Sequence, residues 1–292
     1  MNSDDCTVLI TAYNERSLTR AAEKLYISQP SVTYRIQQIE KYYEVEIFKK
    51  IRKGIRFTAE GEILVGYAKK LLVEHRAIQD TLLNIGDELR GTLRIGVALN
   101  FAHYKLPILL KEFCDKYPRV KVILQTALSP EVMELLQNDI IDVGIESGGY
   151  KWQGEKRILR TDKICIISKE EIEVEQLPFL PMIKNKTNSN LKDLIETWWN
   201  ANFKHPPNVM MEVDHITTCK EMIKSGLGYG IVPSDCLRDN EPFYINELKI
   251  NGKAIQRKTW LNYRNSLASI PVVDEFIKFI LEKTDENSMS EI

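Results

Sequence analysis

The chain has 292 residues, of which 43% are hydrophobic and 28% are charged, and its net charge at pH 7 is −1. These values are typical of a soluble globular protein of two to three domains, at about 100–200 residues per domain. The acidic start MNSDDCTV lacks an apolar signal-peptide core, and no segment approaches the roughly 20 apolar residues of a membrane span. We therefore expect a cytoplasmic protein with no membrane partner.

Residues 16–41 have the pattern of two short amphipathic helices joined by a tight turn. Such a helix-turn-helix places its second helix in the major groove of DNA. Ser28 is a good N-cap for this second helix, and Pro30 suits the first turn because the missing N–H is not needed there. An apolar stripe at i, i+4 and i+7 would face the core, formed by Val32, Ile36 and Ile39.

The remaining faces of the second helix carry side chains that can hydrogen-bond phosphates or base edges. The predicted DNA-binding residues of this helix are Gln29, Pro30, Ser31, Thr33, Tyr34 and Arg35. Gln29 and Arg35 are the predicted base readers. Ser31, Thr33 and Tyr34 are expected to divide between base and phosphate contacts.

A basic run without acidic residues extends over residues 49–56. Such a run is usually a solvated surface. Here it follows a helix-turn-helix, and β-prone pairs lie on both sides of Gly54, which favours a hairpin "wing" that grips the DNA backbone or minor groove. The wing residues predicted to bind DNA are Lys50, Arg52, Lys53 and Arg56.

A long helix is predicted after Thr58, which can act as its N-cap. Apolar positions alternate at spacings of four and three, as in a coiled coil, at Leu64, Ala68, Leu71, His75, Ile78, Leu82 and Ile85. Two partners could bury this seam. One is the chain's own domains, and the other is the same helix of a second subunit.

The rest of the chain alternates strand and helix patterns, which predicts a parallel sheet with right-handed crossovers. Strands are expected at 92–97, 120–124, 140–145, 163–168, 179–183, 209–213, 229–232 and 258–263. Helices are expected at 103–116, 130–137, 191–202, 217–225 and 271–283, followed by a disordered acidic tail at 285–292. Gly86 and Gly91 would bracket a hinge before this region.

The chain resembles the LysR-type transcriptional regulators. The N-terminal match consists of Ser17, Ala21-Ala22, Leu25, residues 28–33, Ile36, Ile39-Glu40, Ile47-Phe48 and residues 57–61. The C-terminal match consists of GTLRIGV at 91–97, NDIIDVGI at 138–145 and KSGLGYGIVP at 224–233. Arg16 and Glu44 replace glycines that are usual in the family. Because glycine there supplies a left-handed backbone, either these turns differ or the chain accepts some strain.

This resemblance implies an α/β fold class with an N-terminal all-α winged helix-turn-helix at 1–58, a linker helix and hinge at 59–90, and an effector-binding domain at 91–292. The last would resemble periplasmic solute-binding proteins, with lobe I at 92–161 plus 267–292 and lobe II at 162–266. The implied partners are double-stranded DNA, further copies of the chain in a dimer or tetramer, a small-molecule effector, and RNA polymerase as a candidate.

An effector belongs in the cleft between the lobes, at the carboxyl ends of strands where helices begin. The candidate contacts are Leu99, Asn100, Phe101, Thr126, Ser129, Glu146, Ser147, Asn188, Ser189, Ile216 and Thr217. Free amides at helix starts suit anionic groups such as carboxylate or phosphate. Each Ser, Thr or Asn could instead be a simple N-cap. Leu99 departs from the Ser or Thr that is frequent in the family.

The leading function is a DNA-binding regulator that responds to a metabolite. The alternatives are an α/β enzyme with an accessory DNA-binding unit and a cytoplasmic small-molecule-binding protein. We find no HExxH, nucleophile elbow or phosphate loop, and GLGYG at 226–230 is better explained by Gly226 as a helix C-cap. We expect no catalytic residue, cofactor or metal. Five cysteines without CxxC spacing indicate reduced thiols, with Cys219 and Cys236 as the candidate redox pair.

Overall fold

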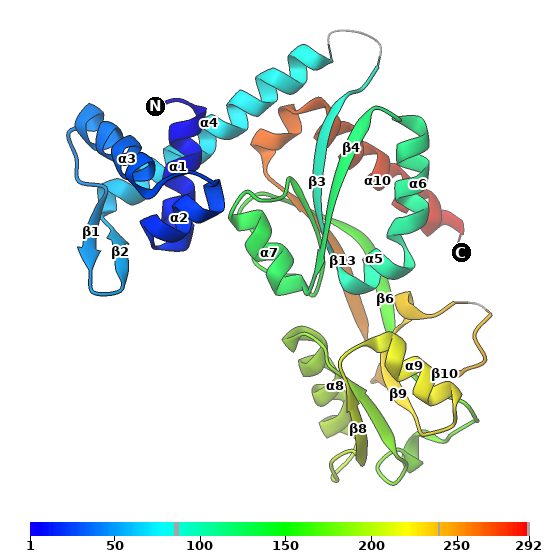
Figure 1. Ribbon diagram of the computed structural model, residues 1–292. Helices are drawn as coiled ribbons and strands as arrows, with labels where there is room; N and C mark the ends of the chain where they lie inside the picture. The colour runs from blue at the N-terminus through cyan, green and yellow to red at the C-terminus, as the bar shows by residue number, and fades with distance from the viewer. Residues whose placement is uncertain (85–87, 239, 291–292) are drawn as a thin grey trace. The chain divides into compact units, whose positions relative to one another are not determined.

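The computed structural model describes residues 1–84, 88–238 and 240–290, apart from the side chains of 268 and 285–290. It contains two compact units, one made of residues 1–87 with 269–271 and the other of residues 88–268 with 272–292 (Figure 1). The predicted seam position Ile85 and the predicted hinge residue Gly86 lie outside the described residues.

The first unit is a winged helix-turn-helix. Its elements are α1 (Ser3–Glu15), α2 (Leu18–Leu25), α3 (Gln29–Tyr43), β1 (Phe48–Ile51), β2 (Gly54–Phe57) and α4 (Ala59–Leu83). Buried side chains from all the helices and from β2 form one hydrophobic core, which includes Leu9, Ala21, Ile36 and Phe57. Burial of these apolar surfaces is the main stabilising contribution to the unit.

The recognition helix α3 begins as the sequence predicts. The Ser28 hydroxyl accepts a hydrogen bond from the Ser31 amide at 3.3 Å, and Pro30 occupies the first turn. The predicted stripe Val32, Ile36 and Ile39 is buried. The register of α3 is therefore fixed by its apolar side, which leaves its other faces free of the core.

Arg16 and Glu44 stand where the family usually has glycine, and both lie at helix ends. Both residues cap helices in the left-handed region, with φ of 51° at Arg16 and 54° at Glu44. The turns therefore keep the geometry that glycine would supply, and the chain accepts the strain of a side chain there. Tyr26, at the end of α2, does the same with φ of 54°.

The linker helix α4 begins at its predicted cap, because the Thr58 hydroxyl accepts from the Gly61 amide at 3.0 Å. Its seam divides into two parts. Leu64 and Ala68 are buried in the core of the winged unit, and Leu71 packs against that core. Ile78 and Leu82 are 60% and 62% exposed. Packing on the chain's own domain thus accounts for the first part of the seam and not for the second.

The second unit is built on a mixed sheet. Its strands lie in the order β10-β6-β13-β5-β3-β4, with β9 also paired to β6. The bounds are β3 (Gly91–Ala98), β4 (Val120–Ala127), β5 (Val143–Ser147), β6 (Glu155–Ser168), β9 (Gly230–Pro233), β10 (Tyr244–Glu247) and β13 (Gln256–Tyr263). Only β4, β3 and β5 run parallel; β13, β6, β9 and β10 pair antiparallel. The expected all-parallel sheet was therefore wrong.

The helices of lobe I surround β3, β4 and β5. They are α5 (Leu99–Tyr104), α6 (Leu106–Lys116), α7 (Ser129–Gln137) and α10 (Pro271–Ser290). The single helix expected at 103–116 is split at Lys105, and α10 continues to Ser290 where a disordered tail was predicted. The rings of Phe113 and Phe276 meet edge to face at 5.1 Å, so α6 and α10 pack together.

Lobe II contains a parallel pair, β7 (Met182–Asn185) and β8 (Val209–Val213), with helices α8 (Ser189–Asn202) and α9 (Ile216–Lys224). The short elements are η1 (Val174–Gln176), η2 (Ser234–Cys236), η3 (Asn265–Ser269), β11 (Lys249–Ile250) and β12 (Lys253–Ala254). Gly226, with φ of 81°, ends α9: its amide donates to the Ile223 oxygen, and the Leu227 amide donates to the Met222 oxygen. This pair of bonds confirms the predicted C-cap.

Strands β6 and β13 run between the lobes. The C-terminal part of β6 pairs with β9 and β10 of lobe II, while its N-terminal part pairs with β13. Strand β13 also pairs with β5 over residues 259–263, which places those residues in the sheet of lobe I. The second crossing between lobes therefore lies near the start of β13 and not at residue 266. The position at residue 266 was the one that the family resemblance implied.

Candidate functional site

The exposed face of α3 carries most of the predicted DNA-binding residues. Gln29, Pro30, Ser31 and Tyr34 are all exposed, and Tyr34 is 62% exposed despite its large ring. Thr33 is half-buried. Its hydroxyl donates to the Gln29 main-chain oxygen at 3.0 Å, so this hydroxyl already has a partner within the helix. The structure thus brings the first turns of α3 to the surface as a polar and aromatic patch.

Arg35 differs from its neighbours because it already has protein partners. Its Nη1 donates to Asp5 Oδ1 at 2.9 Å, and its Nη2 lies 3.3 Å from Asp4 Oδ2. The Asp5 carboxylate also accepts from the Asn2 amide at the start of α1. The guanidinium therefore ties α3 to the first turn of α1, which the sequence pattern did not predict because the partners lie 30 residues apart.

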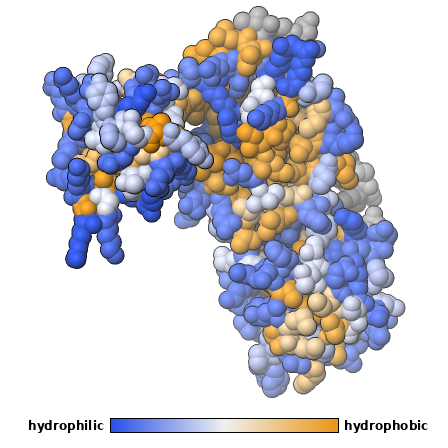
Figure 2. All heavy atoms as spheres, in the orientation of Figure 1, coloured by the Kyte–Doolittle hydropathy of each residue, from blue (hydrophilic) through white to orange (hydrophobic). Residues whose placement is uncertain are grey.

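The wing is a hairpin in which Phe48 pairs with Phe57 and Ile51 with Gly54. The predicted wing residues Lys50, Arg52, Lys53 and Arg56 are exposed, and none of them forms an ion pair with any described residue. Figure 2 shows the hydrophilic surface that projects at the tip of this hairpin. Lys49 differs, since its Nζ lies 3.9 Å from Glu46 Oε2.

The base of the wing fits closely against the end of α1. The Ile55 amide donates to the Arg16 oxygen at 3.0 Å. At Gly54, with φ of 108°, an added Cβ would lie 2.3 Å from that same oxygen. A glycine is therefore required for the hairpin to dock on α1.

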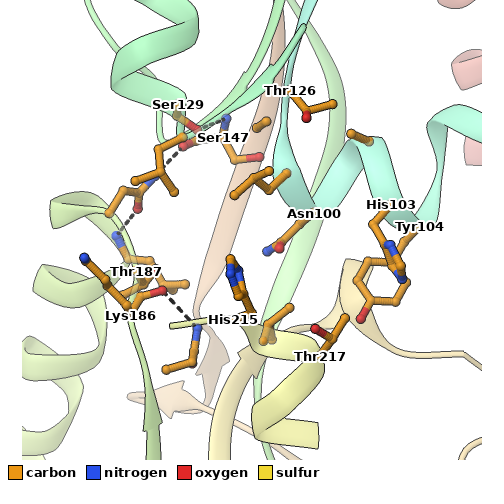
Figure 3. Close-up of a pocket in the computed structure, with 18 of the residues that line it drawn as sticks. Asn100, His103, Tyr104, Thr126, Ser129, Ser147, Lys186, Thr187, His215 and Thr217 are labelled. Atoms are coloured by element: carbon orange, nitrogen blue, oxygen red, sulfur yellow. Dashed lines mark hydrogen bonds between the residues drawn. The ribbon is translucent and has the colours of Figure 1, made fainter. Parts of the chain in front are cut away.

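The second unit contains a cavity of about 340 Å³ between its lobes (Figure 3). The ends of β3, β4 and β5 and the starts of α7, α8 and α9 surround it, as expected for an α/β cleft. The predicted effector residues that line it are Leu99, Asn100, Thr126, Ser129, Ser147, Asn188, Ile216 and Thr217.

Ser147 is the centre of the polar contacts in this cleft. Its main-chain N–H donates to Ser129 Oγ at 3.1 Å and is therefore not available to a ligand. Its hydroxyl lies 3.0 Å from Thr259 Oγ1. Its main-chain oxygen accepts from Asn188 Nδ2 at 3.0 Å and from Arg257 Nη2 at 3.1 Å. These bonds connect α7, β5, β13 and α8, so they set how the two lobes meet.

Three predicted effector residues do not line the cavity. Phe101 is buried in the core, and Ser189 is exposed outside the lining. The buried Glu146 carboxylate accepts from the amides of Gly149 and Tyr150 at 3.1 and 3.2 Å. Burial raises the pKa of Glu146, although Lys156 opposes that shift. Glu146 thus fixes the loop after β5 and points away from the cleft, as alternate residues of a strand must.

The cavity also has lining residues with charged or imidazole side chains that the sequence analysis missed, namely His103, Lys186, Asp214, His215 and Arg257. Lys186, Asp214 and His215 follow β7 and β8, so extending the strand-end rule by one or two positions would have found them. Arg257 lies near the start of an antiparallel strand, where the rule does not apply. No sequence pattern indicated it.

The cysteines are free thiols, and the candidate redox pair is buried. Burial raises the pKa of Cys219 to about 12, and burial together with Asp235 raises that of Cys236. Neither thiol is therefore activated at neutral pH. Among the described residues no cluster of His, Cys, Asp or Glu could hold a metal ion, and no helix there is both long and apolar enough to cross a membrane.

A winged helix-turn-helix followed by a two-lobed α/β binding domain defines a class of DNA-binding regulators. The family model described as "Bacterial regulatory helix-turn-helix protein, lysR family" matches residues 3–62, and the one described as "LysR substrate binding domain" matches residues 86–285. The chain belongs to the LysR family of transcriptional regulators. It is a DNA-binding regulator with an effector-binding domain, and the enzyme alternative is set aside.

Two curated relatives from Bacillus subtilis (strain 168) match almost the whole chain. The HTH-type transcriptional regulator YraN is 47% identical over 281 residues, covering 96% of this chain and 97% of its own. The HTH-type transcriptional regulator YkuM is 31% identical over 293 residues, covering 99% of each. Both are regulators, in agreement with the family.

Solved structures share the fold. A full-length OxyR variant from Pseudomonas aeruginosa aligns with a TM-score of 0.68 at 17% identity, covering 96% of this chain and 94% of its own. Full-length CbnR in complex with its target DNA aligns with a TM-score of 0.57 at 18% identity, covering 97% of this chain and 100% of its own.

Proposed function

We propose that this regulator reads DNA with α3 in the major groove and holds the backbone with its β1–β2 wing. The observation that carries the proposal is the exposure of Gln29, Pro30, Ser31 and Tyr34 on one part of α3. Exposed wing cations supply the sequence-independent attraction to phosphates. Arg35 stays a predicted base reader, but reading a base requires its guanidinium to leave the carboxylates of α1.

We further propose that the second part of the α4 seam pairs with a second subunit, giving a dimer that can associate into a tetramer. Ile78 and Leu82 lie one turn apart and are both exposed, which an isolated helix in water does not favour. Two recognition helices would then bind twofold-related half-sites. I78E/L82E should sediment as a monomer at micromolar concentration, whereas Q79E on the exposed side of the same turn should not. A monomeric wild-type chain would contradict this part of the proposal.

The effector is proposed to bind in the cleft between lobe I and lobe II, with the boundary of the lobes near the start of β13. A ligand that prefers one arrangement of the lobes can shift the assembly only by its differential affinity for that arrangement. Because the target is chromosomal DNA, we place the regulator in the cytoplasm, and RNA polymerase is its further proposed partner at a promoter.

A gel-shift experiment tests the proposal. The full chain should bind the DNA upstream of its own gene more tightly than an unrelated duplex, and the difference should persist as salt is raised. Extracted small-molecule pools should change this binding. Equal, salt-abolished affinity for every duplex would overturn the proposed DNA reading.

A further inference from the structure

Arg257 is a buried cation with few partners. Its side chain lines the cleft, and the residue is only 7% exposed. Nη2 donates to the Ser147 oxygen at 3.1 Å, while the buried Nε has no hydrogen-bond partner among the described residues. In the described part of the chain, Arg257 also forms no ion pair.

Two buried carboxylates lie near Arg257, and neither forms an ion pair with it among the described residues: one is Asp235, whose pKa Arg257 lowers against the larger effect of burial, and the other is Asp162. Asp162 lies opposite Arg257 in the β6–β13 register, but its carboxylate is bound by Arg160, whose Nε and Nη2 lie 3.0 and 2.9 Å from Oδ1. Burying a charge is costly unless it is paired and hydrogen-bonded. A guanidinium in this position is therefore suited to an anion that enters the cleft.

The surroundings of Arg257 also favour a negative group. Lys186 and His215 line the same cavity, where Asp214 is the acidic lining residue and is exposed. His215 is the N-cap residue of α9 and makes no side-chain cap bond, so amides of the first turn of this nine-residue helix are left for another acceptor.

We infer that the effector is a small carboxylic acid whose carboxylate pairs with the Arg257 guanidinium; this inference rests on the proposal that the cleft is the effector site. The N–H groups of a guanidinium form a planar fork that matches the two oxygens of a carboxylate. Arg257 is the one buried cation that lines the cavity in the described part of the chain, which favours a singly charged carboxylate over a dianionic phosphate ester. A cavity of about 340 Å³ limits the acid to a small one.

Matched probes can test the charge requirement on the full chain. Butyrate and benzoate are compared with butyramide and benzamide, which have nearly the same shape without the charge, and with phenyl phosphate. At least one carboxylate should raise the melting temperature with increasing concentration, and its amide should not. Calorimetric titration then gives the affinity for that carboxylate.

Variants test the assigned residue. R257Q should bind the carboxylate at least about tenfold more weakly, because a charge-assisted pair is lost. K186Q, on the exposed edge of the same cavity, should change the affinity less. The melting temperature of the free R257Q protein is recorded as well, because the substitution also removes a positive charge near the buried Asp235. If R257Q does melt lower, R257K separates the loss of stability from the loss of binding, because it keeps the positive charge and must retain part of the affinity for the carboxylate.

Several results would overturn the inference: amides that bind as well as the acids, phenyl phosphate as the sole ligand, no shift with either carboxylate, or unchanged affinity in R257Q and R257K. Promoter binding is measured in parallel. If specific DNA binding persists while the carboxylate results fail, the regulator proposal stands and the assignment of the ligand class is wrong. Loss of both in the wild-type chain would count against the proposed function itself.

Discussion

Asn188 and Ser147 join the two lobes of the effector domain by a direct hydrogen bond. The Asn188 side-chain nitrogen donates to the Ser147 main-chain oxygen at 3.0 Å, and the oxygen of the same amide caps α8 by accepting from the Leu191 amide at 3.1 Å. One side chain thus begins a helix in lobe II and holds the end of a strand in lobe I.

This double role can be separated by substitution. N188D keeps the cap but removes the donor to Ser147, so it should leave α8 intact and change the effector concentration that gives half-maximal response. N188A loses both interactions and should cost a further ~1 kcal/mol of unfolding free energy, as lost caps do. Chemical denaturation and effector titration measure the two effects. Identical effector responses in N188D and wild type would show that the lobe contact is not used.

Arg35 can be tested against its carboxylate partners. R35A should lower the unfolding free energy by about 0.5–1 kcal/mol, because the pair with Asp5 and Asp4 is partly exposed. If Arg35 also reads a base, R35A should cost about 1–3 kcal/mol of binding and relax one position of the site. A double-mutant cycle with D5N separates the two roles. Equal losses on all sequences would identify a phosphate contact instead.

The wing cations should contribute to affinity without sequence preference. K50A, R52A, K53A and R56A should each weaken binding to specific and unrelated duplexes alike and reduce the slope of log affinity against log salt by about 1. K49A is the matched control, since Lys49 is paired with Glu46. A loss restricted to the specific duplex would show that the wing reads sequence.

Glu44 offers a stability test of the left-handed cap. E44G should raise the unfolding free energy by roughly 0.5–1 kcal/mol, because glycine removes the strain at φ of 54° while adding some freedom to the unfolded chain. The control is K41G, inside α3, which should destabilise by about 1 kcal/mol. Thermal or urea unfolding checks both, and destabilisation by E44G would contradict the assigned strain.

The buried thiols should resist modification in the native state. The pKa of Cys219 is raised to about 12 by burial, so its thiolate fraction at pH 7–8 is negligible and grows only as the pH approaches that value. Native thiol titration should detect Cys114, the exposed cysteine, and unfolding should release the others. Loss of free Cys219 and Cys236 after mild peroxide, with retained structure, would revive the redox pair.

The local part of the molecule follows from the sequence. Ser28 and Thr58 cap the helices that they were predicted to cap, and the stripe Val32, Ile36 and Ile39 is buried, because capping and helical periodicity act within a few residues. The strand-end rule likewise placed Asn100, Ser147 and Asn188 at one cleft.

Tertiary structure decided what depends on distant partners. Arg35 meets Asp5 across 30 residues, and Arg257 enters the cleft from an antiparallel strand that breaks the strand–helix alternation. The same strand places the second boundary between the lobes near the start of β13, whereas residue 266 had been expected. Sequence by itself determined the helix-turn-helix, several capped helix starts and the family of this protein. Which charges face a partner and which stay unpaired was decided only by the packing, since electrostatic pairing depends on distance in space and not along the chain.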